Sequence, residues 1–566
     1  MDWNDLDRDK YRDEAEAVAD LRGRLSLTPQ DRAIIQKEAI GLVQSARQLS
    51  RRQGVLESFL QEFSLGTREG LALMCLAEAL LRTPDQDTRD QLIAEKIGPA
   101  DWASHLGQSD SLFVNASTWG LMLTGRLVEV EETARSDLSG YLKRLSARMG
   151  EPVIRAAVAQ AIKIMGEQFV LGRTITAAAK RANVEGQICS FDMLGEGART
   201  AADAARYEAA YADAIDRVGR MKTMTGPEAG HGISVKLSAL SPRYEAVQED
   251  RVSHELYPRI RRLAVMAAKA NINLTLDAEE ADRLVLSLQI LERLAQEPEL
   301  GDWRGLGLAV QAYQKRAPAV IAALIDLAKT TGRRLMVRLV KGAYWDSEIK
   351  RAQVAGRLGY PVYTTKAATD LSYLVCAEAL IQAAPYLYSQ FASHNAHSLA
   401  AVRRMAHQAG VAIEHQRLHG MGEALYRAAR DHYGTLMVRT YAPVGEHEDL
   451  LPYLVRRLLE NGANTSFLHA LLDDRVPAET LVADPVETAA ALCGPHPKIP
   501  LPMNIYGAER INSTGIDLSV AAERQRLGAA VARVAAAADR PTMPMTTGTV
   551  RSRGSMTNPV TKPMAR

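Results

Sequence analysis

A short charged stretch, Tyr-Leu-Val-Arg-Arg-Leu-Leu-Glu at positions 453–460, has residue types suited to anion binding. On a helix its polar and aromatic members fall at i, i+3, i+4 and i+7 and share one face: Tyr453, Arg456, Arg457 and Glu460. Two neighbouring guanidinium groups can bind a carboxylate or a phosphate through paired N–H donors. An ordinary amphipathic helix would leave the same side chains in water. The spacing alone leaves both an anion site and a solvated face open.

Polar clusters also follow short apolar runs in the second part of the chain. After residue 165, eight β-branched or aliphatic runs recur, with helix-length segments between them such as Leu284–Ala295 and Ala317–Thr330. The runs are Gln168–Leu171, Ile233–Leu237, Ile272–Leu276, Leu306–Val310, Leu335–Val340, Tyr386–Ala392, Val411–Gln416 and Thr435–Arg439. Alternating β and α units in this number predict a (β/α)8 barrel. A doubly wound parallel sheet is the alternative, and it is disfavoured because no GxGxxG follows any of these runs.

In a (β/α)8 barrel the active site lies at the C-terminal ends of the strands. The polar and aromatic residues predicted there are Lys236, Asp277, Gln311, Arg338, Lys341, Tyr344, Trp345, Ser393, His394 and Tyr441. Any one of them could be an ordinary solvated or structural side chain. Their convergence on one rim predicts a functional site, and its mainly cationic character suits an anionic substrate with a phosphate-bearing cofactor. No set of Asp, Glu or His has the spacing of metal ligands, so we expect no metal.

Length and composition are consistent with this interpretation. The chain has 566 residues, of which 47% are hydrophobic, so it can form one large barrel with additional parts. The net charge of +2 gives no electrostatic reason to expect nucleic-acid binding. The cysteines form no CxxC motif, which favours reduced thiols in a cytoplasmic protein; they are Cys75, Cys189, Cys376 and Cys493. A polar N-terminus and the lack of a long apolar run predict neither a signal peptide nor a membrane span.

The character of the sequence changes along the chain and suggests five segments. Before residue 166 helical spacing dominates and no strand-like alternation appears, whereas Pro-rich stretches follow residue 475. The last stretch is rich in Thr, Met, Ser and Pro and has no acidic residue. The predicted segments are a helical arm (1–50), an all-helical domain (51–165), the barrel (166–475), a linker (476–540) and a disordered tail (541–566).

Several sequence blocks at the predicted rim occur in the order of a known family. They include Asp192-Met-Leu-Gly-Glu196, Ser234-Val-Lys-Leu-Ser238, Leu276-Asp-Ala-Glu-Glu280, Gln311-Ala-Tyr-Gln-Lys-Arg316, Arg338-Leu-Val-Lys-Gly-Ala-Tyr-Trp345, Ser393-His-Asn-Ala-His397 and His419-Gly-Met-Gly-Glu423. Together with the stretch at 453–458 they resemble the proline dehydrogenase domain of bacterial proline utilization A. The resemblance covers roughly residues 40–520.

This resemblance implies a distorted (β/α)8 barrel that holds FAD noncovalently. The expected reaction oxidises L-proline to Δ1-pyrroline-5-carboxylate by hydride transfer from C5 to flavin N5, and the electrons pass to a quinone. Such an enzyme would be cytoplasmic, with transient contact to the membrane face, and could form a homo-oligomer.

The resemblance also implies roles for particular residues. Those that would hold the proline carboxylate are Lys236, Arg456 and Arg457. Those that would enclose its ring are Leu339, Tyr344, Tyr441 and Tyr453. Asp277 and Arg338 would form the catalytic pair, and Glu196 would pair with one of the two adjacent arginines as a gate. The expected flavin contacts are Ala278, Gln311, Arg338, Val340, Lys341, Gly342, Ala343, Trp345, Thr364, Lys366, Ser393, His394 and Glu460. Strand alternation would put Arg338 and Lys341 on opposite faces, so we expect the chain to turn just before Gly342.

Two features of longer family members are expected to be absent. Members that repress transcription carry a ribbon-helix-helix module, whereas here the resemblance begins almost at once with the helical arm, so we expect no DNA binding. The stretch 496–502 looks like the approach to an aldehyde dehydrogenase domain, but no such domain follows. The alternatives to a flavoenzyme are a class I aldolase-like barrel, in which Lys236 or Lys341 would form a Schiff base, and a non-enzymatic scaffold or DNA-bound regulator.

Overall fold

The structure is a computed structural model, and it describes residues 2–50, 170–195, 197–221, 226–445, 470–471, 475–492 and 494–538. The expected helical domain at 51–165 and the expected tail at 541–566 lie outside these ranges. All structural statements below concern the described residues.

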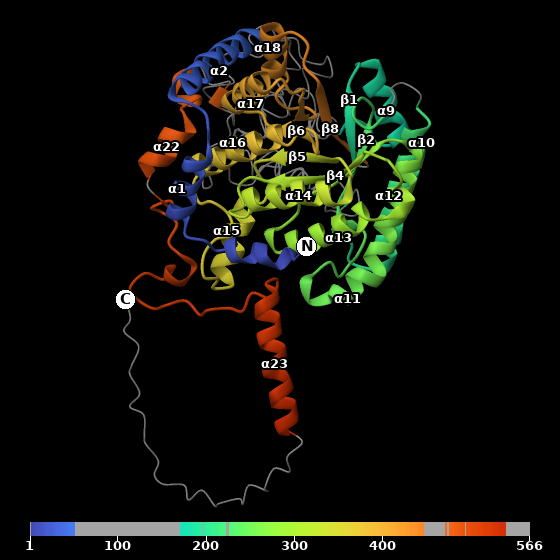
Figure 1. The fold of residues 1–566 in the computed structure, drawn as a ribbon, viewed down its shortest axis with the longest axis vertical. Coiled ribbons are helices and arrows are strands. Elements are labelled where there is room, and N and C mark those ends of the chain that lie inside the picture. Colours follow the sequence, from blue (N-terminus) through green and yellow to red (C-terminus); the bar gives the residue numbers. More distant parts are fainter. Residues whose placement is uncertain are drawn as a thin grey trace, which may run out of the picture.

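Eight parallel strands form a closed barrel in sequence order, which confirms the predicted (β/α)8 architecture (Figure 1). The strands are β1 (Ile188–Met193), β2 (Gly232–Val235), β3 (Asn273–Leu276), β4 (Leu306–Gln311), β5 (Leu335–Val340), β6 (Leu387–Ala392), β7 (Glu414–Leu418) and β8 (Val438–Val444). Pairing of β1 with β8 closes the barrel, with Ser190 opposite Tyr441.

The first predicted strand is wrong. Of the run expected at 168–171, the structure describes residues 170 and 171, and these are not part of a barrel strand. The Leu171 amide donates to Pro443 O at 2.9 Å, and Gly172 forms an isolated bridge to Val444 at the end of β8. The true first strand is β1. Strand β7 begins at Glu414 rather than at 411, and β8 extends to Val444 rather than ending at 439.

Helices cover the outside of the barrel and alternate with the strands along the chain. They are α9 (Ile175–Val184), α10 (Ala201–Gly219), α12 (Tyr257–Ala270), α13 (Leu284–Ala295), α14 (Ala317–Thr331), α15 (Trp345–Val354), α16 (Lys366–Gln382), α17 (Ala396–Ala409) and α18 (Glu423–Tyr433). The predicted helix over 284–295 matches α13, and the one over 317–330 matches α14 to within one residue.

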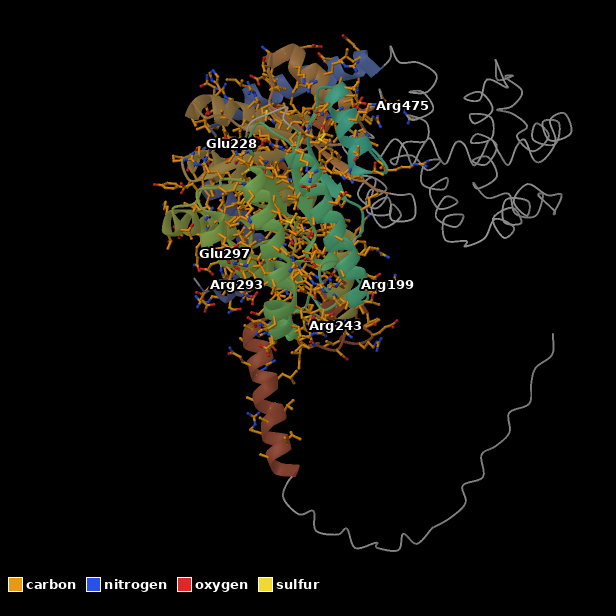
Figure 2. The ribbon with its side chains drawn as sticks, turned by 90° about the vertical axis from the view of Figure 1, so that its right-hand side faces the viewer. Arg199, Glu228, Arg243, Arg293, Glu297 and Arg475 are labelled. Atoms are coloured by element: carbon orange, nitrogen blue, oxygen red, sulfur yellow. The ribbon has the colours of Figure 1, made fainter. Side chains whose placement is uncertain are left out.

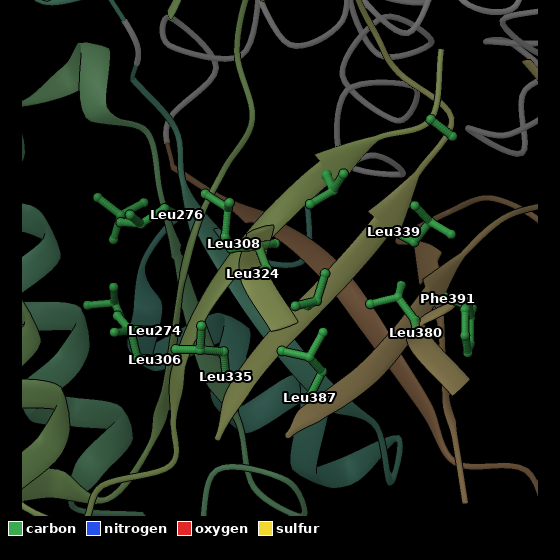
Figure 3. Packing of buried hydrophobic residues seen from close by; sticks show 14 of the residues in the cluster. Leu274, Leu276, Leu306, Leu308, Leu324, Leu335, Leu339, Leu380, Leu387 and Phe391 are labelled. Carbon is green, nitrogen blue, oxygen red and sulfur yellow. The ribbon is translucent and has the colours of Figure 1, made fainter. Parts of the chain in front are cut away.

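Leucine packing between strands and helices forms the main core (Figure 3). On β5 the outward residues Leu335, Val337 and Leu339 are buried in this core, whereas Arg338 points into the barrel. Leu324 of α14 and Leu380 of α16 pack in the same cluster. Burying a leucine side chain of this kind contributes about 1.5–3 kcal/mol, so the strand alternation fixes which β5 residues can reach the interior.

Segments from both ends of the described chain wrap this barrel. The N-terminal ones are η1 (Trp3–Asp9), α1 (Glu14–Arg24) and α2 (Pro29–Ser50), and the C-terminal ones are α21 (Ala478–Leu481), α22 (Pro485–Leu492), η8 (Pro502–Asn504) and α23 (Ala521–Ala538). Helix α2 packs on α17 and α18, and α1 packs on α16 and α22. Segments from both the N-terminal and the C-terminal part of the chain therefore pack on the barrel helices, while α23 projects away from the barrel (Figures 1 and 2).

Candidate active site

Four side chains on or just beyond four strands meet inside the barrel. Arg338 of β5 donates to Asp277, just beyond β3, at 2.8 Å. Tyr441 of β8 donates to the other oxygen of Asp277 at 2.6 Å. Lys236, just beyond β2, lies 3.5 Å from Asp277 Oδ2 and 3.3 Å from the Tyr441 hydroxyl. Asp277 thus joins two cations and a phenol in one cluster.

Strand β1 completes the cluster with two residues that sequence reasoning did not assign. Asp192 is fully buried, and its Oδ1 accepts a hydrogen bond from Lys236 Nζ. Ser190 accepts one from Arg338 Nη2 at 3.0 Å. The other oxygen of Asp192 has no hydrogen-bond partner among the described residues. The sequence block containing Asp192 was the available signal, but the misplaced first strand hid its position.

Two cations and two carboxylates lie close together in a buried space, so their charges interact strongly. Burial raises the pKa of Asp192, and the nearby Asp277 carboxylate adds to this. Burial alone would lower the pKa of Lys236, but Asp192, Tyr441 and Asp277 outweigh it, so the pKa of Lys236 is well above its ordinary value. Lys236 is therefore a charged group at neutral pH, suited to an anionic ligand.

A second charged group lies where β5 leads into α15 and where α16 begins. Lys341 Nζ donates to Asp370, and Lys366 Nζ lies 3.5 Å from the other oxygen of that carboxylate. Two lysines share one acid, so the group keeps a net positive charge beside the N-terminus of α16. Both features favour binding of an anion such as a phosphate.

A sharp turn at Gly342 follows Lys341 at the end of β5. The strand ends at Val340, and Gly342 follows with φ +129°. A Cβ atom on Gly342 would lie 2.4 Å from the Tyr313 ring, so only glycine fits. Arg338 and Lys341 precede this turn, and the strand alternation puts them on opposite faces, with Arg338 inside the barrel and Lys341 at α16.

The remaining predicted rim residues have defined local partners. Gln311 Nε2 donates to Glu279 O at 3.0 Å and lies 3.5 Å from Ala278 O. His394 Nε2 accepts from the Leu418 amide at 3.0 Å, which assigns its proton to Nδ1. Trp345 Nε1 donates to Tyr363 O at 2.8 Å. Val340, Ala343, Tyr344 and Ser393 are half-buried at the rim, and Ser393 Oγ accepts from the Asn395 amide at 3.1 Å.

The structure does not place Leu339 at the pocket. This side chain is fully buried and lies on the face of β5 opposite to Arg338, against the surrounding helices (Figure 3). Strand alternation, which the resemblance overrode, gives the physical reason. Five other predicted site residues lie outside the described residues: Glu196, Tyr453, Arg456, Arg457 and Glu460.

Within the described ranges, no group of three His, Cys, Asp or Glu side chains is placed to hold a metal ion. Among the same residues, no helix is long and apolar enough to cross a membrane.

This chain forms a parallel (β/α)8 barrel with buried, paired charges at its C-terminal rim, which is the arrangement found in (β/α)8-barrel enzymes. A family profile described as proline dehydrogenase matches residues 175–470 of this chain. The chain belongs to the proline dehydrogenase family.

Relatives and solved structures agree with this assignment. The chain is 52% identical over 527 residues to the bifunctional protein PutA of Salmonella typhimurium, across 90% of this chain and 40% of that protein. It is 49% identical over 488 residues to bifunctional protein PutA of Rhizobium meliloti, across 84% of this chain and 39% of that protein. A crystal structure of a proline utilization A mutant from Bradyrhizobium japonicum matches with a TM-score of 0.73 and 46% identity, covering 92% of this chain and 53% of that one. The chain thus spans less than half the length of these curated relatives.

A second profile, described as the DNA-binding domain of proline dehydrogenase, matches residues 55–169. This match conflicts with the expectation that the chain binds no nucleic acid. That expectation rested on the net charge and on the missing ribbon-helix-helix pattern, and neither argument bears on residues 55–169. We therefore withdraw the expectation that the chain binds no nucleic acid. The matched residues lie outside the described ranges.

Proposed function

We propose that this chain oxidises L-proline to Δ1-pyrroline-5-carboxylate, with FAD as the hydride acceptor and a quinone as the final electron acceptor. The observation that carries the proposal is the cluster of Lys236, Asp277, Arg338 and Tyr441 on one rim, beside the separate cationic group at α16. One group suits an amino acid and the other suits a phosphate-bearing cofactor. Family membership supports the same reaction.

The buried ammonium of Lys236 would bind the proline carboxylate, together with Arg456 and Arg457 of the predicted helix. Three cations on one carboxylate would fix the orientation of the ring, and such positioning can supply up to about 7–11 kcal/mol of a reaction barrier in ideal cases. Asp277 would keep Arg338 in place, because it accepts a hydrogen bond from that guanidinium. Tyr441 would close one side of the pocket, since its hydroxyl is held by Asp277.

The charged residues around α16 fit a flavin dinucleotide. Lys341 and Lys366 have a net positive charge that would hold the pyrophosphate, and Trp345 lies in the same turn. When bound, FAD supplies the two-electron acceptor that no amino-acid side chain provides. Arg338 would stabilise negative charge on the cofactor, because it is a permanently charged group buried at the rim.

A visible spectrum recorded before and after anaerobic addition of L-proline tests this function. We expect a flavin spectrum that proline bleaches. A protein that stays colourless after incubation with FAD would refute the proposal.

A Schiff-base enzyme is the second candidate, and one observation favours it. Burial lowers the pKa of Lys341, with a smaller contribution from Lys366, and this would ease formation of a neutral amine. Its Nζ is, however, hydrogen-bonded to Asp370. Borohydride added with substrate would trap a covalent adduct on Lys341 under this alternative and none under the flavin mechanism.

A further inference from the structure

The N-terminal arm reaches the loop that leads into α16. Glu14, the first residue of α1, accepts hydrogen bonds at Oε1 from the Thr364 amide at 2.8 Å and from the Thr364 hydroxyl at 2.9 Å. These residues are 350 positions apart in the sequence. Glu14 is 3% exposed and Thr364 is 2% exposed, so the contact is closed to solvent.

The segment after α22 joins the same contact. The His496 amide donates to the Thr364 hydroxyl oxygen at 2.7 Å. The hydroxyl therefore donates a hydrogen bond to Glu14 and accepts one from the His496 amide, so three distant segments meet at one side chain. A hydroxyl used in this way fixes the backbone around it rather than offering its proton to a ligand.

Burying this carboxylate is costly, and a single cation compensates it. Lys315 Nζ lies 3.8 Å from Glu14 Oε2 and donates to Arg12 O at 2.9 Å. Burial raises the pKa of Glu14 and lowers the pKa of Lys315. Removing the acceptor would leave the Thr364 N–H and O–H buried without partners, and unmet donors of this kind are strongly unfavourable.

The loop held by Glu14 directly precedes the cationic group proposed to bind the cofactor. Thr365 is the N-cap of α16 and accepts from the Ala368 amide, and Lys366 is the first residue of the helix. On its other side the loop is held by the Trp345–Tyr363 hydrogen bond. The position of Thr364 therefore sets where α16 begins and where Lys366 points.

We propose that Glu14 is a positioning residue for the cofactor site: through Thr364 it couples the N-terminal arm and the segment after α22 to the start of α16. This inference rests on the proposed binding of FAD. It predicts that breaking a contact in the arm weakens FAD binding, although the arm residue touches no cofactor atom.

Glu14→Met is the main test, because it keeps the side-chain length and removes the acceptor. We expect faster hydrogen exchange at the Thr364–Lys366 amides in the cofactor-free protein, and FAD affinity weaker by about tenfold in a flavin-fluorescence titration. Glu14→Gln keeps an acceptor oxygen and should restore much of both. Glu16→Met on the exposed face of the same helix is the matched control and should leave both unchanged.

Thr364→Val tests the contact from the other side if Glu14→Met folds poorly. It should speed exchange in α1, which a lost cofactor contact alone would not do. If the unmodified protein binds FAD and Glu14→Met binds it as tightly as Glu16→Met, the inference is overturned while the proposed function stands. If the unmodified protein binds no FAD, the proposed function itself fails and the inference with it.

Discussion

Lys236→Met should destabilise the protein by an amount that depends strongly on pH. The substitution leaves the fully buried Asp192 without the cation that now donates to it. Breaking a buried ion pair from one side typically costs about 3–5 kcal/mol. Asp277 is spared because Arg338 still donates to it at 2.8 Å.

Protonation of Asp192 sets an upper limit on this loss. In the variant the folded-state pKa of Asp192 lies above its unfolded value of about 3.9, so the folded state binds the proton. Holding that proton at pH 7 costs about 1.36 kcal/mol for each of roughly three pH units, or about 4 kcal/mol. At pH 5 the same reasoning gives about 1.5 kcal/mol. Stability is therefore lost as pH rises, as the sign for a raised acid pKa requires.

Urea unfolding at pH 5 and pH 7 measures this difference. The comparison needs the unmodified protein, Lys236→Met, Asp192→Asn and the double variant. Because the double variant carries no unpaired buried charge, it should be more stable than Lys236→Met at pH 7, and its deficit should change little with pH. An equal loss at both pH values for Lys236→Met, or no rescue by Asp192→Asn, would show that the two groups do not form the buried pair described here.

Three further outcomes are expected. Arg456→Met should raise the KM for proline by tenfold or more while FAD stays bound, because the variant loses a charge-assisted hydrogen bond of about 1.5–3 kcal/mol. Loss of FAD at an unchanged KM would contradict the assignment of Arg456 to the anion site. Gly342→Ala should cost about 1–3 kcal/mol in denaturant unfolding and lower the flavin content, because its φ is +129° and the new Cβ would meet Tyr313. Burial raises the pKa of Glu348 to about 7, so its contribution to the free energy of unfolding falls as pH rises from about 4.5 to 7. Glu348→Gln should abolish this fall, which amounts to up to about 3 kcal/mol over that range. The same pH dependence of unfolding in the variant would contradict this assignment.

Much of the barrel could be predicted from the sequence because the outward residues of β2 to β5 are apolar and buried in the core. Strands β4 and β5 are buried throughout, apart from the half-buried Val340, and their predicted runs match the structure closely. The helix boundaries of α13 and α14 follow from clear apolar periodicity ended by a change to polar residues. The rim residues could be predicted as well, because the chain order of a parallel barrel places all strand C-termini at one end.

The pairing within the rim could not be predicted, because it depends on which face each strand turns inward. The resemblance placed Leu339 beside the substrate, although the alternation of β5 sends it outward. Conversely, Asp192 and Ser190 were left without a role, although both point at the central cluster. Contacts across 350 residues, such as Glu14 with Thr364, leave no periodic signal at all.

The strands whose predicted bounds were wrong, β1, β7 and β8, each carry buried charged residues. An apolar run is easiest to recognise in a strand such as β4, whose inward and outward residues are both apolar apart from the terminal Gln311. Strand β1 alternates Cys189 and Phe191 in the core with Ser190 and Asp192 in the site, so its apolar content is halved. Strands β7 and β8 are interrupted in the same way by the buried pair of Glu414 and Arg439. A weak apolar signal does not by itself mark the site: Arg338 lies on β5, whose run was predicted well. Arg439, paired with Glu414, donates to Gly230 O just before β2 begins, so this pair lies away from the C-terminal rim.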